Sequence, residues 1–161
     1  MSPKSSKSVE VLLKEKRIYE IVNPKLLHAS PDISLQSAVQ LMQERKAGYI
    51  VIARDKKVVG IFTETDVVQK ILGKDIDWNR PVSEFMTANP HVLSLQDSAG
   101  KAIDVMGEGH FYHIPLVDEK GEMVNVISVR TLIRFLAEFY PTEVYNLPPK
   151  PDQAMLTQEG G

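Results

Sequence analysis

The sequence contains no cysteine, has aromatic side chains at only 7% of its 161 positions, and carries no large excess of charge of either sign. The lack of cysteine excludes disulfide frameworks, thiolate catalysis and Cys-ligated zinc or iron–sulfur sites. The 19 Lys and Arg residues are balanced by 21 Asp and Glu residues, so no basic excess drives sequence-independent binding to nucleic acid or to an anionic membrane. We therefore expect neither of these partners.

Long apolar runs are also missing. The longest, residues 49–53, is far shorter than the ~20 residues that span a bilayer. The polar, lysine-bearing N-terminus is not followed by the apolar block of a secretory signal, so we expect a cytoplasmic protein. With 43% hydrophobic and 25% charged residues, the chain has the balance of a globular protein with a packed core.

The sequence repeats itself at a shift of 64 residues. Apolar residues with the spacing of one helix face recur in both copies, and each stripe is followed by a short apolar run that favours a strand. One extra residue, Gly121, raises the shift to 65, after which a further strand and a second helical stripe recur. Each copy therefore predicts the order strand, helix, strand, strand, helix, with a hairpin between the second and third strands.

Two such copies predict an α+β fold in which two β-α-β-β-α motifs pack about a pseudo-two-fold axis, with a cleft on either side of their contact. Each copy alone is too small to bury enough surface to offset its loss of conformational entropy. The predicted organisation is an N-terminal segment with a helix (residues 1–25), motif 1 (26–72), a linker with a brief helical stretch (73–89), motif 2 (90–137) and a proline-rich, irregular C-terminal tail (138–161).

The tandem copies resemble a pair of CBS (cystathionine-β-synthase type) motifs, also called a Bateman module, in a stand-alone bacterial-type protein. The residues that carry the resemblance are Gly-Ile-Phe-Thr-Glu-Thr-Asp at 60–66, Ile-Pro-Leu-Val-Asp at 114–118 and Phe-Met-Thr at 85–87. The resemblance implies a regulatory module, usually a homodimer, that binds AMP, ADP, ATP, S-adenosylmethionine or another adenosine ligand between its motifs. It implies no required cofactor, although Mg²⁺ can accompany ATP.

Thr63 ends a predicted strand and opens a predicted helix, where its hydroxyl and the free backbone N–H groups offer a site for an anion. Asp66, one turn further, can accept hydrogen bonds from the two hydroxyls of a ribose, and the resemblance assigns phosphate and ribose to these two residues. The same pair also fits a helix capping box, worth about 1 kcal/mol. For the adenine ring we expect apolar walls and backbone hydrogen bonds from Ile61 and from Leu27 to Ser30, which include His28 and Ala29, although core packing also accounts for Ile61. Gly60 is a further expected ligand contact.

Motif 2 departs from this pattern, because the corresponding residues are Ser128 and Thr131 and the ribose carboxylate is lost. This second cleft is expected either to be empty or to hold an anion with help from Arg130, whose other interpretation is a solvated charge on a helix face. The resemblance places further phosphate partners ahead of the second strand: Lys46 in motif 1, and His110, Tyr112 and His113 in motif 2. Two histidines on a loop are too few to predict a metal site.

We therefore expect a module that senses an adenine nucleotide, mainly in the cleft of Asp66, and changes its conformation or its contact with an unknown effector protein. Asp66→Ala should then weaken binding of AMP or ATP much more than Thr131→Ala. Two alternatives stay open: a constitutive interaction module with vestigial clefts, whose tail recruits a partner, and a nucleotide hydrolase. No G-x-S-x-G elbow, Walker A loop or H-E-x-x-H motif occurs, so no enzyme activity is expected.

Overall fold

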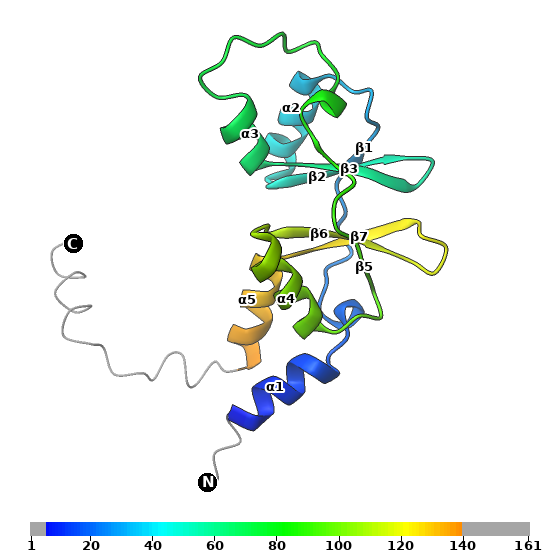
Figure 1. The fold of residues 1–161 in the computed structure, drawn as a ribbon, viewed down its shortest axis with the longest axis vertical. Coiled ribbons are helices and arrows are strands. Elements are labelled where there is room, and N and C mark those ends of the chain that lie inside the picture. The colour runs from blue at the N-terminus through cyan, green and yellow to red at the C-terminus, as the bar shows by residue number, and fades with distance from the viewer. Residues whose placement is uncertain (1–5, 140–161) are drawn as a thin grey trace, which may run out of the picture.

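The computed structural model describes residues 6–139, and two β-α-β-β-α units lie one above the other within them (Figure 1). Motif 1 contains β1 (His28–Ala29), α2 (Leu35–Arg45), β2 (Tyr49–Arg54), β3 (Lys57–Thr63) and α3 (Glu64–Lys70). Motif 2 repeats the order with β5 (Leu93–Ser94), α4 (Ala99–Gly109), β6 (His113–Val117), β7 (Met123–Ser128) and α5 (Val129–Phe139). The predicted fold class is confirmed, while most of the predicted C-terminal tail lies outside the described residues.

Each motif has its own sheet. The order is β1-β2-β3-β4 in motif 1, where β4 (Thr87–Ala88) comes from the linker, and β5-β6-β7 in motif 2. In both sheets the short first strand is parallel to the second, and the second and third are antiparallel. The sheets face each other at the middle of the molecule, with the helices of both motifs on the outer sides (Figure 1). The turns from β3 into α3 and from β7 into α5 therefore lie at the edge of the contact between motifs.

The first helix of each motif begins and ends with the same local chemistry. Ser34 and Ser98 cap the two helices, each accepting a hydrogen bond from the backbone N–H three residues on, at 3.0 and 3.1 Å. Both helices end at a left-handed residue, Lys46 (φ 50°) and His110 (φ 54°). The buried side chains are those of the predicted stripes: Leu35, Ala38 and Met42 in α2, and Ala99, Ala102 and Met106 in α4.

The segment ahead of each motif packs into the core of the other motif. Ile18 begins a short 3-10 helix, η1 (Ile18–Glu20), and is fully buried among motif 2 residues. Its counterpart at the repeat shift, Val82, begins η2 (Val82–Glu84) and is fully buried among motif 1 residues. Backbone bonds fix both crossings, from Ile18 N to Asp97 O at 2.9 Å and from Val82 N to Ile33 O at 2.8 Å. Each motif therefore completes its core with a segment that precedes the other.

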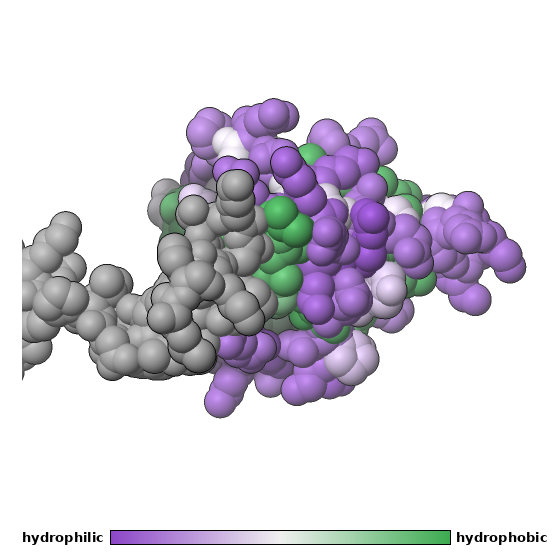
Figure 2. All heavy atoms as spheres, turned by 90° about the horizontal axis from the view of Figure 1, so that it is seen from below, coloured by the Kyte–Doolittle hydropathy of each residue, from purple (hydrophilic) through white to green (hydrophobic). Residues whose placement is uncertain are grey.

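The N-terminal helix α1 (Ser6–Glu15) packs on α4 of motif 2. Gly100 permits this approach, because a Cβ added there would lie 3.3 Å from the backbone oxygen of Leu13. Seen from this end of the molecule, the surface is mostly hydrophilic, with a hydrophobic band near its centre (Figure 2). None of the helices within residues 6–139 is long and apolar enough to cross a membrane.

Candidate functional site

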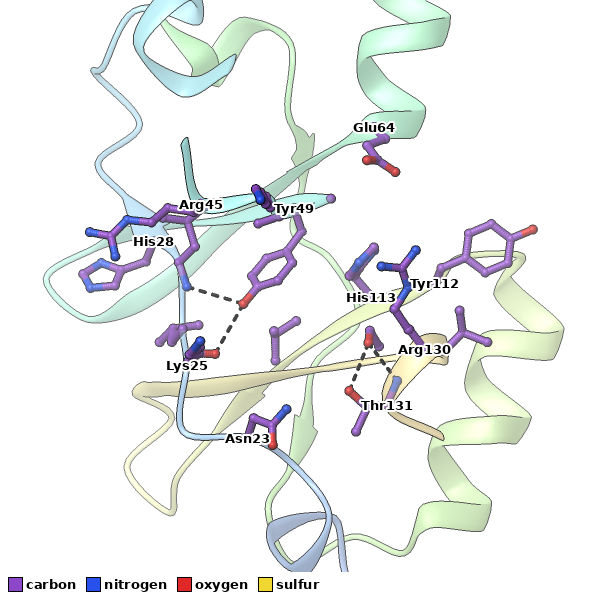
Figure 3. A pocket seen from close by; sticks show the side chains of 18 of the residues that line it. Asn23, Lys25, His28, Arg45, Tyr49, Glu64, Tyr112, His113, Arg130 and Thr131 are labelled. Atoms are coloured by element: carbon purple, nitrogen blue, oxygen red, sulfur yellow. Dashed lines mark hydrogen bonds between the residues drawn. The ribbon is translucent and has the colours of Figure 1, made fainter. Parts of the chain in front are cut away.

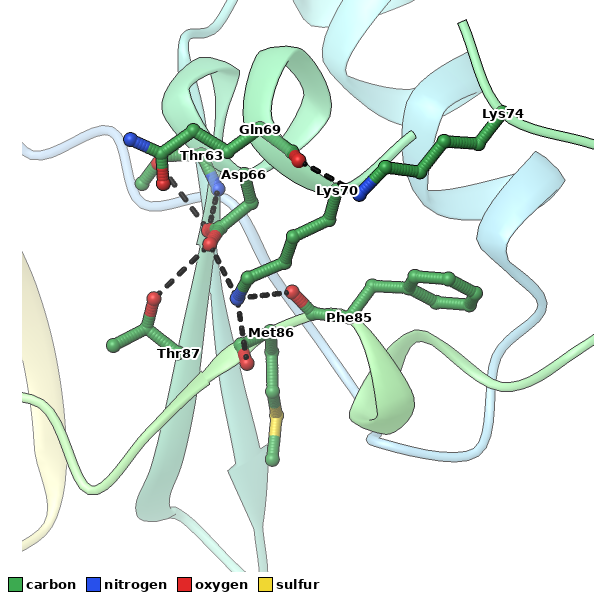
Figure 4. Close-up of polar contacts among 8 residues, drawn as sticks. All are labelled: Thr63, Asp66, Gln69, Lys70, Lys74, Phe85, Met86 and Thr87. Carbon is green, nitrogen blue, oxygen red and sulfur yellow. Dashed lines mark hydrogen bonds and ion pairs between the residues drawn. The ribbon is translucent and has the colours of Figure 1, made fainter. Parts of the chain in front are cut away.

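Asp66 lies in the first turn of α3 with only 4% of its surface exposed. Its Oδ2 accepts hydrogen bonds from the backbone N–H of Thr63 at 2.9 Å and from the Thr63 hydroxyl at 3.3 Å. This is the geometry of a capping box, the alternative that the sequence left open. The other oxygen, Oδ1, accepts a hydrogen bond from the Thr87 hydroxyl at 3.1 Å and pairs with Lys70 Nζ at 2.8 Å (Figure 4). Both carboxylate oxygens are thus engaged within the chain.

Lys70 closes this cluster from the side of the linker. Besides the ion pair with Asp66, its ammonium group donates hydrogen bonds to the carbonyl oxygens of Phe85 at 2.8 Å and Met86 at 3.3 Å (Figure 4). The three donors of the ammonium group therefore have three partners. At the equivalent positions motif 2 has Thr131 and Phe135, so it has no such ion pair.

Three of the expected ligand contacts pack within motif 1. Gly60 lies against Met86, since a Cβ added at Gly60 would clash with the Met86 side chain. Ile61 is 5% exposed and pairs with Val51 across the sheet, and Ala29 packs against the motif 1 core. These three positions do not line the cavity described next.

A cavity of about 1000 Å³, which we call the α5 cavity, lies beside the start of α5 and has walls from both motifs (Figure 3). Its lining comes from the segment ahead of β1, the end of α2, the starts of β2 and β6, and the first turns of α5. Eight of the residues that the sequence pointed to line it: Leu27, His28, Lys46, Tyr112, His113, Ser128, Arg130 and Thr131. Thr63 and Asp66 do not, so the space is open at the second cleft, where the sequence placed the weaker site. The ribose role of Asp66 stays a prediction.

The α5 cavity is strongly basic, although the chain as a whole has a formal net charge of -2. Only one acidic side chain, that of Glu64, is among its lining residues. Five exposed basic side chains oppose it: Lys25, Arg45, Lys46, Arg130 and Arg134. This arrangement favours an anionic ligand.

Sequence reasoning missed Lys25, Arg45 and Arg134, because their charges are far apart along the chain and come together only in the fold. One local signal was present. Arg130 and Arg134 are four residues apart on one helix, and residues with that spacing lie on the same helix face. Glu64 and Tyr49 were missed for the same reason.

Tyr49 and His113 occupy equivalent positions in the two motifs and meet where the motifs contact each other. Their ring centroids are 5.2 Å apart and the rings are tilted by 37°. The Tyr49 hydroxyl accepts a hydrogen bond from Leu27 N at 3.4 Å and donates to Lys25 O at 3.5 Å (Figure 3). Burial raises the pKa of Tyr49, and the bond from Leu27 only partly opposes this, so the ring is a neutral wall of the cavity.

Burial lowers the pKa of His113 below its ordinary value of 6.5. The carboxylate of Glu64 opposes this shift, and the guanidinium of Arg130 adds to it. The imidazole is therefore mainly neutral at pH 7. An anion bound beside it would favour the protonated form and add one more positive charge to the cavity.

At the start of α5, the hydroxyls of Ser128 and Thr131 have no charged side chain as a hydrogen-bond partner among the described residues. Ser128 Oγ accepts a hydrogen bond from Thr131 N at 3.1 Å and lies 3.1 Å from Thr131 Oγ1. Both hydroxyls line the α5 cavity at the positive end of an 11-residue helix. One of the two hydroxyls donates to the other, and the second can donate a hydrogen bond to an anion there.

The two sides of the pseudo-symmetric molecule differ in the size of two side chains. Leu27 and Ala47 line the α5 cavity. Their counterparts at the repeat shift, His91 and Phe111, stack with ring centroids 6.2 Å apart. The small side chain of Ala47 at the α5 cavity therefore corresponds to the aromatic ring of Phe111 on the side of Asp66.

Within residues 6–139, no group of three or more His, Asp or Glu side chains is placed to hold a metal ion. His110, an expected phosphate partner, is exposed at the end of α4 and does not line the α5 cavity.

Comparison with known proteins gives a match to the CBS domain family model over residues 18–73 and 82–138. The two matched ranges begin at Ile18 and Val82, the residues that cross between motifs. An uncharacterized 17.7 kDa protein of Acidianus ambivalens is 29% identical over 125 residues, which are 77% of this chain and 75% of that protein. The chain spans only 20% of a CBS domain-containing protein of Arabidopsis thaliana, with 28% identity over 106 residues.

Solved structures share the fold. An uncharacterized conserved protein from Pyrococcus horikoshii has a TM-score of 0.68 and 25% identity, with 85% of this chain and 97% of that chain covered. A CBS domain protein from Pyrobaculum aerophilum, complexed with AMP, has a TM-score of 0.67 and 19% identity, with 72% and 89% covered.

Proposed function

Because this chain belongs to the CBS domain family, we propose that it is a regulatory module that binds an adenine nucleotide in the α5 cavity and changes its conformation in response. The observation that carries the proposal is the cavity itself, which has walls from both motifs, five basic side chains and two hydroxyls at a helix start. The AMP complex of the Pyrobaculum aerophilum protein supports the ligand class through its shared fold.

Within the cavity, the phosphate lies against Arg130 and the hydroxyls of Ser128 and Thr131. Helix N-termini bind phosphate well, because their free N–H groups and the helix dipole favour negative charge. The apolar part of the lining, which includes Leu27 and Val126, is a wall for the adenine ring. The proposed role is binding and not turnover.

A ligand changes the conformation only if it binds two states of the module with different affinity. The α5 cavity suits that purpose, because a ligand in it touches residues of both motifs. We include a homodimer in the proposal, since apolar side chains on α3, just after it and on α5 are exposed: Val68 by 63%, Leu72 by 61% and Ile133 by 60%. Analytical ultracentrifugation of the full chain would measure its molecular mass in solution and so distinguish a monomer from a dimer.

Calorimetric titration with AMP, ADP and ATP, with and without Mg²⁺, tests the ligand and its site. We expect one nucleotide per chain. Arg130→Gln should weaken binding about tenfold, since a hydrogen bond to a charged group is worth about 1.5–3 kcal/mol. Arg54→Gln, which removes the same charge at an exposed position outside the cavity, should change affinity little.

Asp66→Asn discriminates the two clefts. Binding in the α5 cavity predicts that this variant keeps its nucleotide affinity although its stability falls. A large loss of affinity in Asp66→Asn, with little change in Arg130→Gln, would instead favour the cleft that the resemblance assigns. Absence of any thermal shift with every adenosine compound at saturating concentration would favour the constitutive interaction module.

A further inference from the structure

We propose that the α5 cavity discriminates nucleotides by their number of phosphate groups and prefers a triphosphate to a monophosphate. The inference rests on the proposed nucleotide-binding function and adds the ligand class within it. It comes from the number and placement of the basic side chains around the cavity, and from the fact that none of them has an ion-pair partner within residues 6–139.

The first step is the charge balance. Five Lys and Arg side chains line the cavity against the single carboxylate of Glu64, which leaves an excess of four positive charges. A terminal phosphate carries about −1.5 to −2 charge at pH 7, and each inner phosphate of a nucleotide adds roughly one more. A monophosphate therefore leaves about half of the excess uncompensated, whereas a triphosphate balances it.

The second step is the lack of ion-pair partners. Among the described residues, ion pairs within 4.0 Å involve Lys16, Arg54, Lys70, Arg80 and Lys101, and none of the five cavity cations. Like charges gathered in one cavity repel each other, so the free protein holds them at a cost in free energy that a polyanion relieves. All five are exposed, so this effect is screened by salt.

The third step is the placement of these cations on two sides. Arg130 and Arg134 are one turn apart on α5 of motif 2. In motif 1, Lys25 comes from the segment ahead of β1, and Arg45 and Lys46 from the end of α2. Figure 3 shows Tyr49 between Arg45 and Lys25 on one side and Arg130 on the other. A monophosphate contacts one of the two groups, whereas a chain of phosphates can extend from one to the other.

The size of the cavity agrees with a long ligand. Its volume of about 1000 Å³ lies at the upper end of the roughly 300–1,000 Å³ found for small-molecule pockets. A ligand that joins the two cation groups also joins the two motifs. The number of phosphates would then decide whether the bound ligand bridges the two motifs.

The experiment measures dissociation constants of the full chain for AMP, ADP, ATP and inorganic tripolyphosphate by calorimetry, at low and at physiological ionic strength. We expect affinity to rise from AMP to ADP to ATP, with ATP at least about tenfold tighter than AMP at low salt, and we expect the ratio to narrow as salt screens the charges. Equal affinities, or tighter binding of AMP, would overturn the proposal.

Charge-removing variants test the mechanism. Arg134→Gln and Lys25→Gln should each weaken ATP binding several-fold while changing AMP binding less, so the ratio of the two affinities falls. The matched control is Arg54→Gln, whose side chain is 59% exposed and lies outside the cavity, and which should leave the ratio unchanged. Equal losses for AMP and ATP in Arg134→Gln and Lys25→Gln would refute selection by phosphate number.

The four compounds distinguish failure of selection by phosphate number from failure of the proposed nucleotide-binding function. If AMP and ATP bind equally well, selection by phosphate number fails and the nucleotide-binding function stands. If tripolyphosphate binds as tightly as ATP and AMP does not bind, the charge selection stands and adenine recognition fails. If none of the four compounds binds, both fail.

Discussion

At the scale of single residues, Asp66 and Thr131 hold equivalent places in two copies of one motif, yet their surroundings give them different tasks. Asp66 is buried, caps α3 and pairs with Lys70. Thr131 lies on the wall of the α5 cavity, and among the described residues its hydroxyl has one hydrogen-bond partner, the hydroxyl of Ser128. The same position in the repeat is therefore structural in one motif and accessible to a ligand in the other.

Asp66→Ala should lower the free energy of unfolding by about 2–4 kcal/mol, because it leaves the Lys70 ammonium without its counter-ion. We place the value below the full cost of breaking a buried pair, since Lys70 is 37% exposed. Urea denaturation measures it. Thr131→Ala serves as the matched control and should cost less than about 1 kcal/mol. Equal losses in the two variants would contradict a structural role specific to Asp66.

His113 should make stability depend on pH. Its pKa in the folded protein is lowered by burial, so the unfolded chain binds a proton first as the pH falls below about 6.5. The free energy of unfolding should therefore fall from about pH 6.5 down through the lower pKa of the folded state, and the contribution should be fully present above pH 6.5. Urea denaturation of His113→Asn between pH 5 and 8 should show a weaker dependence.

The control for this experiment is His110→Asn, which removes an exposed histidine at the end of α4 and keeps a residue that tolerates the left-handed backbone. It should retain the pH dependence of the natural sequence. A pH profile of His113→Asn that matches that of the natural sequence would rule out the buried imidazole as its source.

At the scale of elements, the short helices η1 and η2 decide how the motifs join. Each is only three residues long, yet each brings a fully buried apolar side chain into the core of the other motif. Each short helix thus precedes one motif in the sequence and packs into the core of the other motif. This exchange makes the stability of each half depend on a segment outside it.

Ile18→Ala should lower the free energy of unfolding by about 2–5 kcal/mol through loss of burial and creation of a cavity. The loss of stability should be largest in motif 2, where Ile18 packs, so hydrogen exchange should accelerate in α4, β6 and β7 more than in motif 1. Tyr19→Ala, at the neighbouring 52% exposed position, is the control and should have a small effect. Faster exchange confined to motif 1 would contradict the crossed packing.

At the scale of the whole molecule, the exchange of segments predicts that both motifs unfold together. Fluorescence of Trp78, whose backbone oxygen accepts a hydrogen bond from the first turn of α2, reports on motif 1, while far-ultraviolet circular dichroism reports on both motifs. We expect the two signals to give one coincident transition in urea. Separate transitions would show that the motifs are independent units.

The sequence by itself determined the fold class, because a repeated apolar pattern with helical and strand spacing is local information. The stripes of α2 and α4 and their serine caps follow from residues within a few positions of each other. The resemblance to CBS motifs, carried by short runs of neighbouring residues, was confirmed by the family match. Several residues of the second cleft were also marked by their positions in the repeat.

Only the tertiary structure decided which cleft is open and what lines it. The burial of Asp66 depends on Lys70 and on the linker that folds back onto it, and the open space beside α5 depends on Ala47 standing where the other side has Phe111. The positive charge of the cavity depends on bringing Lys25 next to residues more than a hundred positions away. These features arise from contacts between distant parts of the chain, so local patterns such as the spacing of Arg130 and Arg134 indicate only single contributions to them.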